Sequence, residues 1–556
     1  MNFTISKERL ALLAQKYKKT FPEPEPLPQI HTSDISVLRQ EELSQVTDKH
    51  GNLITYNSRQ QEFISLASSG KSCVLIGAAG TGKTTCQKGA TQALIQSGKA
   101  GVLEGSHKYL QMGTPGIVIC AFTRRAAANI AANLPPDLRK NCMTIHALLE
   151  YQPEYFDVQD PTTGEFKKSM RFLPSRTADN PLSPSIKTII FEETSMLGTD
   201  LHQEVINACP HNPQLIYLGD IQQLPPVFGP AILGFKLLEL PVVELTEVYR
   251  QALESPIISL AHRCLSGKGI ASSEFPEWNR DGLTIRPFKK RVEPEYATIG
   301  IGNLLCQMAD QDLYKPQDDM ILIPFNKAFG TDELNKIMAN HLARKRGAET
   351  HEIIAGFQKV YLSVGDKILV DKEDAVITKI ETNPAYYGAK FKPASKTLDY
   401  WGHDPVLAVD QELLDDDMDF ILSQVASQAG KEKEDRVNQA SHFIHYLKDK
   451  AEFPEKVQSA GDVNSILLGY VLTVHKAQGS EWNKVIMIMH ASHATMNSRE
   501  LLYTAITRAK KELLILCEPD TLMKGIENAR IKGTTLAEKA VFFKGKKDKM
   551  AAESLS

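Results

Sequence analysis

Short apolar runs alternate with helix-like segments through the first half of the chain. The runs occupy Ser72–Ile76, Ile117–Ala121, Thr188–Phe191 and Leu215–Leu218, and Thr84–Ser97 reads as a helix that ends before Gly98. Apolar runs of this length, separated by helices, are typical of buried strands in a parallel sheet. The pattern between about 51 and 245 therefore predicts an α/β unit.

A second α/β pattern begins near Met320–Met338 and resumes over Ser465–Glu518. The intervening residues 346–462 begin with a β-like segment, Val360–Ile380, and end in a charged stretch, Asp410–Lys450, that we expect to be helical. We therefore predict a second α/β domain interrupted by a β-barrel-like and helical insert. The acidic run Asp415–Asp417 is expected to be a solvated helix face.

A small hairpin is expected inside the first unit. Glu154–Gln159 and Glu165–Phe172 have strand character, and they flank the turn-rich residues Asp160–Gly164. Outside the two units, the polar residues 1–50 include the Pro-rich stretch Pro22–Pro28, which we interpret as a linker after a helical arm. Residues 521–556 form a basic tail, and for its Lys-rich stretch, Lys544–Lys549, we expect a solvated terminus or, alternatively, a nucleic-acid contact.

Composition fits an ordered multidomain protein. The 556 residues are 42% hydrophobic and 24% charged, which allows several cores, with roughly three or four domains as a first expectation. The net charge of −3 argues mildly against a nucleic-acid binder, but such a binder needs only a local basic groove. The sequence therefore leaves a nucleic-acid substrate open.

The cysteines and the apolar runs indicate a soluble, intracellular protein without a membrane span. The N-terminus, MNFTISKERL, lacks an apolar signal core, and no apolar run reaches the roughly 18 residues of a membrane helix. The eight cysteines form no CxxC pair, so we expect buried, reduced thiols. They are Cys73, Cys86, Cys120, Cys142, Cys209, Cys264, Cys306 and Cys517.

A phosphate-binding loop follows the first apolar run. Its residues are Gly77, Ala78, Ala79, Gly80, Thr81, Gly82, Lys83 and Thr84, which match G-x-x-x-x-G-K-[ST]. A strand precedes this loop and a helix follows it, which is the context that the motif requires. Backbone N–H groups and the helix N-terminus bind phosphates, Lys83 reaches the β- and γ-phosphates, and the Thr84 hydroxyl ligates Mg²⁺. The loop predicts an NTPase but does not indicate which process the hydrolysis drives.

Two carboxylates end the strand Thr188–Phe191. In a parallel sheet, the carboxyl ends of the strands line the ligand crevice. We therefore expect Glu192 to support Mg²⁺ and Glu193 to orient or deprotonate the attacking water.

Further blocks in the first unit carry a family resemblance. Gly219–Val227 reads GDIQQLPPV, Glu192–Met196 reads EETSM, and Leu245–Gln251 reads LTEVYRQ. They resemble the GDxxQLPPV, DEASM and LTxxYRQ elements of the RecD/Dda-type helicases of superfamily 1, with Glu192 in place of the usual Asp. Tyr56–Gln60 (YNSRQ) occupies the position where that family carries its adenine-reading Gln.

The second unit continues the resemblance in the family's order. Ile323–Lys327 (IPFNK) followed by Leu334-Asn335 is similar to PFNK…LN, and Gly365-Asp366 is similar to the start of GDKV. Leu472–Glu481 contains TVHKAQGSE, and Leu502–Ala509 reads LYTAITRA, as in the family. The resemblance runs from about 54 to 518 and leaves the arm and the tail outside it.

The resemblance implies roles that the residues alone do not define. It makes Arg508 and Arg250 cations that approach the γ-phosphate from the second domain, where an arginine finger stabilises charge; a lone Arg would otherwise be read as a surface ion pair. It makes Gln223 the residue that couples the phosphate state to the DNA groove, and it places Tyr249 on the adenine. The remaining nucleotide contacts that it implies are Tyr56, Gln60, Thr85, Gly479 and Glu481.

Candidate DNA contacts lie in both units, because single-strand grooves combine cations with stacking surfaces. Phe122 replaces the usual Pro of the family, and base stacking and core packing are equally plausible for it. For His146, local packing is the alternative to phosphate contact. The full set is Phe122, Thr123, Arg124, Thr144 and His146 in the first unit, and Asn326, Thr473, His475 and Lys476 in the second.

The resemblance predicts two RecA-like P-loop domains and a DNA helicase that uses ATP and Mg²⁺. The domains are expected at 51–150 with 186–245 and at 246–345 with 463–520; the hairpin insert, 151–185, would separate the strands, and 346–462 would be SH3-like with helices. Polarity, 5′ to 3′, comes from resemblance alone. We expect a monomer acting on single strands and duplex junctions, with replication or recombination proteins as candidate partners. The alternatives are a translocase that does not unwind or that prefers RNA, and a nucleotide-controlled switch.

Overall fold

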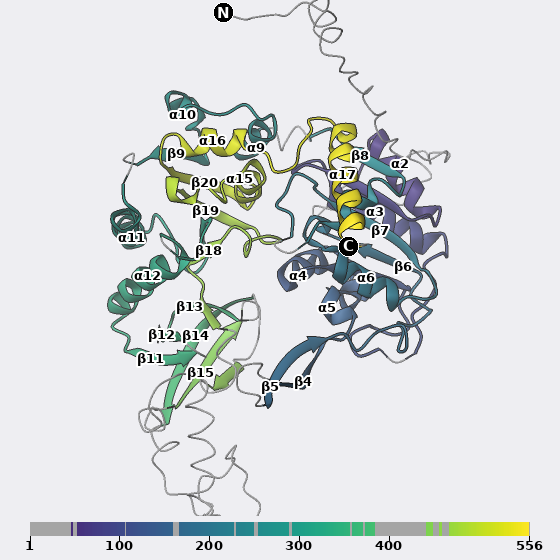
Figure 1. Cartoon of the computed structure of the whole chain (residues 1–556), viewed down its shortest axis with the longest axis horizontal. Coiled ribbons are helices and arrows are strands. Elements are labelled where there is room, and N and C mark those ends of the chain that lie inside the picture. The colour runs from purple at the N-terminus through teal and green to yellow at the C-terminus, as the bar shows by residue number, and fades with distance from the viewer. Residues whose placement is uncertain are drawn as a thin grey trace, which may run out of the picture.

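The structure is a computed structural model, shown in Figure 1. It describes residues 46–47, 53–105, 107–159, 166–226, 229–248, 254–288, 292–327, 329–355, 358–370, 373–383, 441–448, 455–458 and 466–554. The predicted N-terminal arm, with its Pro-rich stretch, lies outside these residues except for Val46 and Thr47. The acidic run Asp415–Asp417 and the hairpin turn Asp160–Gly164 also lie outside them.

The first lobe is built on a six-stranded sheet with the order β3-β2-β6-β7-β1-β8, in which every neighbouring pair is parallel. Its strands are β1 (Cys73–Gly77), β2 (Ile117–Ala121), β3 (Cys142–Thr144), β6 (Thr188–Phe191), β7 (Gln214–Gly219) and β8 (Val242–Leu245). Its helices are α2 (Ser58–Ser68), α3 (Lys83–Gln96), α4 (Arg124–Ala132), α5 (Ile145–Leu148), α6 (Thr199–Asn207) and α7 (Ile232–Lys236).

Both faces of the first sheet are buried, as its continuous apolar strands predict. Along β1, Val74 and Ile76 belong to a core cluster shared with α7, whereas Cys73 and Leu75 belong to a cluster shared with α2 and α3. Because strand side chains alternate between faces, one strand contributes to both cores. This arrangement places the carboxyl ends of β1, β6 and β7 at one edge, where the loops of the candidate site begin.

The second lobe has a five-stranded sheet with the order β18-β10-β19-β20-β9, also parallel throughout. Its strands are β9 (Leu283–Pro287), β10 (Met320–Ile323), β18 (Val471–Thr473), β19 (Trp482–Met489) and β20 (Ala509–Cys517). Its helices are α9 (Pro256–Leu265), α10 (Phe275–Trp278), α11 (Pro294–Asp310), α12 (Thr331–Arg346), α15 (Arg499–Ile506) and α16 (Thr521–Glu527). The two parallel sheets confirm the predicted α/β fold class.

An antiparallel β subdomain interrupts the second lobe between α12 and β18. Its main sheet has the order β16-β15-β14-β13-β17, formed by β13 (Lys367–Val370), β14 (Glu373–Asn383), β15 (Ser441–Lys448), β16 (Glu455–Gln458) and β17 (Ile466–Leu468). The pair β11 (Thr350–Ala355) and β12 (Gln358–Ser363) forms a second sheet. The β-like segment Val360–Ile380 is thus confirmed.

The expected helix over Asp410–Lys450 is wrong at its end, because Ser441–Lys448 forms strand β15. Ile444 and Tyr446 are buried with the partner strand β14, and the intervening His445 is less buried. This two-residue period is that of a strand, and the surrounding charges obscured it. Residues 384–440 lie outside the described residues.

The predicted hairpin consists of β4 (Gln152–Gln159) and β5 (Phe166–Leu173), paired from Gln152 opposite Leu173 to Gln159 opposite Phe166. In Figure 1 it projects from the first lobe toward the β subdomain. The structure therefore confirms the hairpin but does not test its use.

The chain after α16 returns to the first lobe as a helix, and its Lys-rich stretch, Lys544–Lys549, is exposed, as expected for a solvated face. Residues Leu536–Ser554 form helix α17, drawn in yellow beside the first lobe in Figure 1. Phe543 is buried against Gly234 of α7, where a Cβ would lie only 2.3 Å from the ring. Lys547 Nζ also lies 2.6 Å from Oε1 of Glu239. Phe542 and Phe543 provide the apolar face of α17. The neighbouring lysines made this face hard to recognise in the sequence.

Candidate nucleotide site and lobe interface

The phosphate loop joins β1 to α3 and has the backbone that phosphate binding requires. Gly80 and Gly82 adopt φ of +81° and +87°, a left-handed region that side chains disfavour. At Gly77 a Cβ would lie 2.4 Å from Oγ1 of Thr81. Lys83 begins α3, and its Nζ donates to the carbonyl oxygens of Gly77, at 2.7 Å, and Ala78, at 3.1 Å. The loop is thus a compact cradle at a helix N-terminus.

Glu192 and Glu193 lie directly after β6, as predicted. Burial and the neighbouring Glu193 raise the pKa of Glu192 to about 8, although Lys83 acts to lower it. Glu193 has a φ of +50°, and its Oε2 is a buried atom without a hydrogen-bond partner among the described residues. A partly buried pair of neighbouring carboxylates is stabilised by a cation. These residues and the Lys83 loop therefore fit a magnesium-bound triphosphate.

Tyr503 of α15 joins the second lobe to the phosphate loop. Its hydroxyl accepts a hydrogen bond from the Ala79 N–H at 2.7 Å and donates one to Oδ2 of Asp220 at 2.5 Å. Burial and the adjacent Asp220 raise the pKa of Tyr503 well above its usual value, so the hydroxyl keeps its proton. On the other side of the loop, Nε2 of His262 lies 3.4 Å from the Ala79 carbonyl oxygen.

The loop after β7 contains Gln223 and is also held by the second lobe. The Leu224 N–H donates to Oγ1 of Thr504 at 3.0 Å, and Nε2 of Gln478 donates to the Leu224 carbonyl oxygen at 2.9 Å. Gln223 is buried, and its Oε1 has no hydrogen-bond partner among the described residues. The side chain predicted to couple the two sites thus lies where the lobes meet.

Arg508 lies at the end of α15 and is 3% exposed. Its guanidinium donates to the carbonyl oxygens of Thr504, at 2.9 Å, and Ser480, at 3.1 Å, and to Oγ1 of Thr507 at 3.0 Å. These partners belong to the second lobe and fix the position of the side chain. Tyr249 and Arg250 lie outside the described residues.

The candidate adenine contacts have structural partners. Gln60 is buried in α2, and its Oε1 accepts a hydrogen bond from the Asn57 N–H in a capping box. Tyr56 is 2% exposed and packs against α3, where a Cβ on Gly89 would lie 2.7 Å from its hydroxyl. Both side chains shape this end of the first lobe, and their contact with adenine stays a prediction. The other predicted loop residues, Thr84 and Thr85, follow Lys83 in the first turn of α3.

The first-lobe DNA candidates lie around the N-termini of α4 and α5. The rings of Phe122 and His146 meet edge to face at 5.9 Å, and His146 meets Tyr151 in the same way at 4.9 Å. The hydroxyls of Thr123 and Thr144 cap their helices, accepting from Ala126 and Ala147. These two threonines thus have structural roles, whereas Arg124 is exposed on the first turn of α4.

The second-lobe DNA candidates lie at the ends of β10 and β18. Asn326 and Lys476 are exposed, whereas Thr473 is buried and its Oγ1 accepts from the Lys476 N–H at 3.3 Å. Burial and the nearby Arg530 lower the pKa of His475, which favours a neutral imidazole. Parallel strands β10 and β18 are neighbours, so the structure brings both blocks to one edge.

Gly479 and Glu481, predicted as nucleotide contacts, occupy the same edge but have other neighbours. Gly479 has a φ of +75° and approaches the first lobe so closely that a Cβ would lie 2.8 Å from Oγ1 of Thr123. Glu481 is exposed and pairs with Lys510 at 3.3 Å. The structure thus gives Gly479 a role in lobe contact, and nucleotide contact stays a prediction for both residues.

Sequence reasoning missed two residues that join the lobes. Arg125 of α4 forms an ion pair with Asp374 of the β subdomain, and its guanidinium lies 4.8 Å from the centre of the Trp482 ring. Tyr503 lies within LYTAITRA, but the motif alone assigns no role to its side chain. Their partners lie more than 200 residues away along the chain, so motif spacing offers no signal for these contacts.

Comparisons with known proteins agree with this geometry. The family model described as an AAA domain matches residues 60–229, and the UvrD-like helicase C-terminal domain matches residues 468–516. The "ATP-dependent RecD2 DNA helicase" of Deinococcus radiodurans is 26% identical over 449 residues, which cover 79% of this chain and 46% of the relative. The "RecBCD enzyme subunit RecD" of Haemophilus influenzae is 22% identical over 61% of this chain and 52% of the relative.

The chain therefore spans about half the length of these two curated relatives. Among solved structures, a Pif1 helicase from Bacteroides in complex with ADP-AlF3 and ssDNA is 16% identical, with a TM-score of 0.43, over 88% of this chain and 98% of that one. None of the described helices has the length and apolarity to cross a membrane. With both family models matching parts of the two lobes, and RecD proteins among the relatives, the chain is similar to the RecD-type helicases of superfamily 1B.

Proposed function

We propose that this protein is an ATP-dependent DNA helicase that moves 5′ to 3′ along a single strand and unwinds the duplex ahead of it. One observation carries the proposal: the phosphate loop of the first lobe is hydrogen-bonded, through Ala79, to Tyr503 of the second lobe. A nucleotide on this loop would therefore lie at the boundary between lobes, where binding and release alter their contact. A nucleotide-controlled switch that regulates a partner protein would not need contacts from a second lobe at its phosphate loop.

The residues of the site can divide the chemistry of hydrolysis. Magnesium-bound ATP would supply the phosphoryl group and the free energy. The loop amides and Lys83 would hold the phosphates, while Thr84 and Glu192 would ligate Mg²⁺. Glu193, with its unpartnered Oε2, would orient the water and take its proton. Arg508, together with Arg250, would stabilise charge from the second lobe.

The single-stranded DNA would lie across both lobes, along the edge of the molecule that carries the candidate DNA contacts. Phe122 and His146 would offer ring faces and a polar edge, and Lys476 and Asn326 would contact phosphates from the second lobe. The hairpin β4–β5 would then lie where the duplex arrives. The two relatives support a DNA substrate, since one is named a DNA helicase and the other a subunit of the RecBCD enzyme.

We further propose a monomer that works inside the cell with recombination or replication proteins. All eight cysteines are free thiols, and seven are buried, which suits a reducing compartment. A recombination partner follows the RecBCD name of the relative. Light scattering of the protein alone and with a forked DNA would test the monomer.

A strand-displacement assay tests the activity. Matched duplexes carrying a 5′ tail, a 3′ tail or no tail are incubated with the protein and ATP. We expect displacement from the 5′-tailed duplex. Preference for the 3′ tail would reverse the polarity. ATPase stimulated by single strands without displacement would favour a translocase, and stronger stimulation by RNA would favour an RNA track. Failure of every single strand to stimulate ATPase would favour the switch.

A further inference from the structure

The hairpin β4–β5 is joined to the first lobe through two residues that flank it in sequence. The chain enters the hairpin just after Glu150 and leaves it just before Arg176. The N–H groups of Ser175 and Arg176 both donate to the Leu149 carbonyl oxygen at 3.1 Å. The two ends of the hairpin are therefore held together where they meet the lobe.

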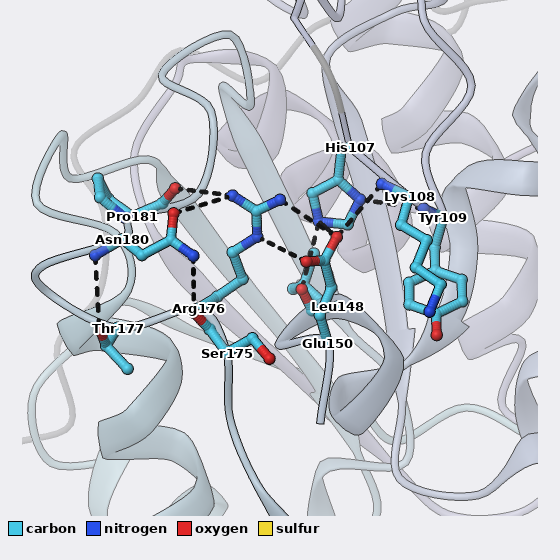
Figure 2. Close-up of polar contacts among 10 residues, drawn as sticks. All are labelled: His107, Lys108, Tyr109, Leu148, Glu150, Ser175, Arg176, Thr177, Asn180 and Pro181. Carbon is cyan, nitrogen blue, oxygen red and sulfur yellow. Dashed lines mark hydrogen bonds and ion pairs between the residues drawn. The ribbon is translucent and has the colours of Figure 1, made fainter. Parts of the chain in front are cut away.

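Glu150 and Arg176 form a largely buried ion pair with two hydrogen bonds at this base, shown in Figure 2. Arg176 Nε lies 3.0 Å from Oε2 of Glu150, and its Nη2 lies 3.2 Å from Oε1. The side chains are only 17% and 10% exposed. Two parallel N–H donors from one guanidinium fix both the orientation and the distance of the carboxylate, because both hydrogen bonds must form at the same time.

Neighbouring groups orient both members of the pair. Asn180 Oδ1 accepts from Nη1 of Arg176 at 3.4 Å, and the Lys108 N–H donates to Oε1 of Glu150 at 3.2 Å. His107 lies behind the carboxylate, with its Nε2 3.7 Å from Oε1, and burial lowers the pKa of this imidazole. Although burial acts to raise the pKa of Glu150, the hydrogen bond from Arg176 helps to keep it below its usual value.

The backbone of Glu150 has an uncommon conformation. Its φ is +50°, in the left-handed region that residues with a Cβ seldom adopt. Such a conformation persists when the surrounding contacts over-determine it. Here the side-chain contacts of Glu150 and the hydrogen bonds to Leu149 supply that constraint.

A second anchor connects the hairpin base with the candidate DNA groove. The Tyr151 hydroxyl donates to Oε2 of Glu204 in α6, and its ring meets His146 edge to face at 4.9 Å. His146 in turn meets Phe122 at 5.9 Å. A row of three rings therefore runs from the candidate base-stacking position to the first residue of the hairpin base.

We propose that Glu150, Arg176 and Tyr151 are positioning residues for strand separation, which fix the hairpin at one angle to the first lobe and to the strand that crosses it. The proposal rests on the proposed helicase function. None of the three has to touch DNA or nucleotide. Their role is mechanical. A hairpin that can rotate relative to the first lobe would be displaced by the duplex instead of separating its strands.

The variants Arg176→Gln and Glu150→Gln separate unwinding from motion. Removing one partner of a buried charged hydrogen bond should lower strand displacement about tenfold or more, with a larger deficit on GC-rich than on AT-rich duplex. Two activities do not need the hairpin: ATPase stimulated by single strands, and removal of streptavidin from a biotinylated single strand. The rates of both should stay within about twofold of the wild-type rates, the size of effect expected from one exposed contact. Glu512→Gln, which breaks the exposed ion pair with Lys484, is the matched control.

Amide hydrogen exchange provides a readout that does not depend on unwinding. We expect faster exchange over Gln152–Gln159 and Phe166–Leu173 in the Arg176 variant, with β1 and β2 unchanged, since only the hairpin base is loosened. Tyr151→Phe, which keeps the ring but loses the Glu204 bond, should give a smaller change in the same direction.

The outcomes separate the proposal from the helicase function. If the wild-type protein displaces no strand, the proposed function fails and the exchange experiment alone decides this inference. Unchanged exchange in the hairpin, or displacement equal to wild type, would overturn the positioning role. A parallel loss of ATPase, streptavidin removal and displacement would also overturn it, because such a loss indicates general structural damage.

Discussion

The Tyr503 hydroxyl donates to Oδ2 of Asp220 at 2.5 Å, and the Tyr503 hydroxyl oxygen also accepts the Ala79 N–H at 2.7 Å. A single side chain of the second lobe therefore contacts both the phosphate loop and the loop that contains Gln223. Asp220 is 1% exposed, and its Oδ1 accepts the Gln222 N–H at 3.0 Å. Loss of the Tyr503 hydroxyl would leave a buried carboxylate oxygen without this donor, at a place where the two lobes are in contact.

Tyr503→Phe should uncouple the lobes more than it weakens nucleotide binding. We expect DNA-stimulated kcat to fall about tenfold, in line with the loss of a hydrogen bond to a buried charge, while ATP affinity changes little. Steady-state ATPase with and without single strands would measure this. Tyr314→Phe is the matched control, since that buried hydroxyl bonds the Tyr470 carbonyl within the second lobe. Equal effects from both variants would contradict a special role for Tyr503.

Lys83→Ala should abolish ATP hydrolysis, because the ammonium group that reaches the phosphates is lost. We expect turnover to fall at least about a hundredfold, a typical loss for a preorganised charged contact. A phosphate-release assay would measure it, with the exposed Lys71→Ala as control. Near-normal turnover would remove the phosphate loop from the active site.

Glu193→Gln should bind ATP and hydrolyse it poorly. The amide keeps the size of the side chain but cannot accept a proton from water, so we expect hydrolysis to fall by about 10² to 10⁴. Binding of a fluorescent ATP analogue and single-turnover hydrolysis would be compared. Unchanged hydrolysis would assign the proton acceptor elsewhere, with Glu192 as the next candidate.

Arg508→Ala should retain ATP binding and lose hydrolysis, by about 10³ if it acts as an arginine finger. The change also strips the Ser480 and Thr504 carbonyl oxygens of a donor, so the thermal unfolding midpoint should be recorded beside the kinetics. Arg508→Gln is a second variant that can still donate a hydrogen bond. Wild-type rates in both variants would reject the finger assignment.

Acid should destabilise the protein through two buried histidines. Burial lowers the pKa of His202 and of His493 to about 4. Because the unfolded chain binds protons near the ordinary pKa of about 6.5, stability is complete above that pH and is lost as the pH falls toward 4. By linkage, each histidine should cost roughly 1 to 2 kcal/mol between pH 7.5 and 5.5.

Urea unfolding midpoints at these two pH values would measure the acid effect. His202→Gln keeps a polar side chain beside the Tyr217 hydroxyl, 2.8 Å from Nε2 in the native protein, but removes the titrating group. We expect a smaller pH dependence in this variant. An identical dependence would show that other groups dominate.

The sequence predicted the parts of the molecule that local chemistry defines. The strand before Gly77 and the helix after Lys83 follow from apolar periodicity and glycine spacing, and the structure has them within a residue of the prediction. The carboxylates after Phe191 were expected from the rule that strand ends line a crevice. Each of these features depends on residues that are neighbours in the chain.

The features that the sequence did not predict depend on the tertiary arrangement. Tyr503 and Asp220 are 283 residues apart, and Arg125 and Asp374 are 249 apart, so no periodicity links them. The sequence did not predict the base of the hairpin because Glu150 and Arg176 are 26 residues apart, and only the folded chain brings them together. Strand β15 was missed because charged neighbours masked its two-residue alternation.

The return of the chain to the first lobe has a mechanical consequence. Residues 246–255 carry the chain from β8 to α9, and residues 528–535 carry it back from α16 to α17. Arg530 and Ile531 are fastened to Glu500 in the second lobe, whereas Phe543 is buried in the first. Two chain crossings restrict the relative motion of the lobes more than a single crossing would. In the proposed helicase, this restriction would limit how far the candidate DNA contacts of the two lobes can separate in each nucleotide cycle.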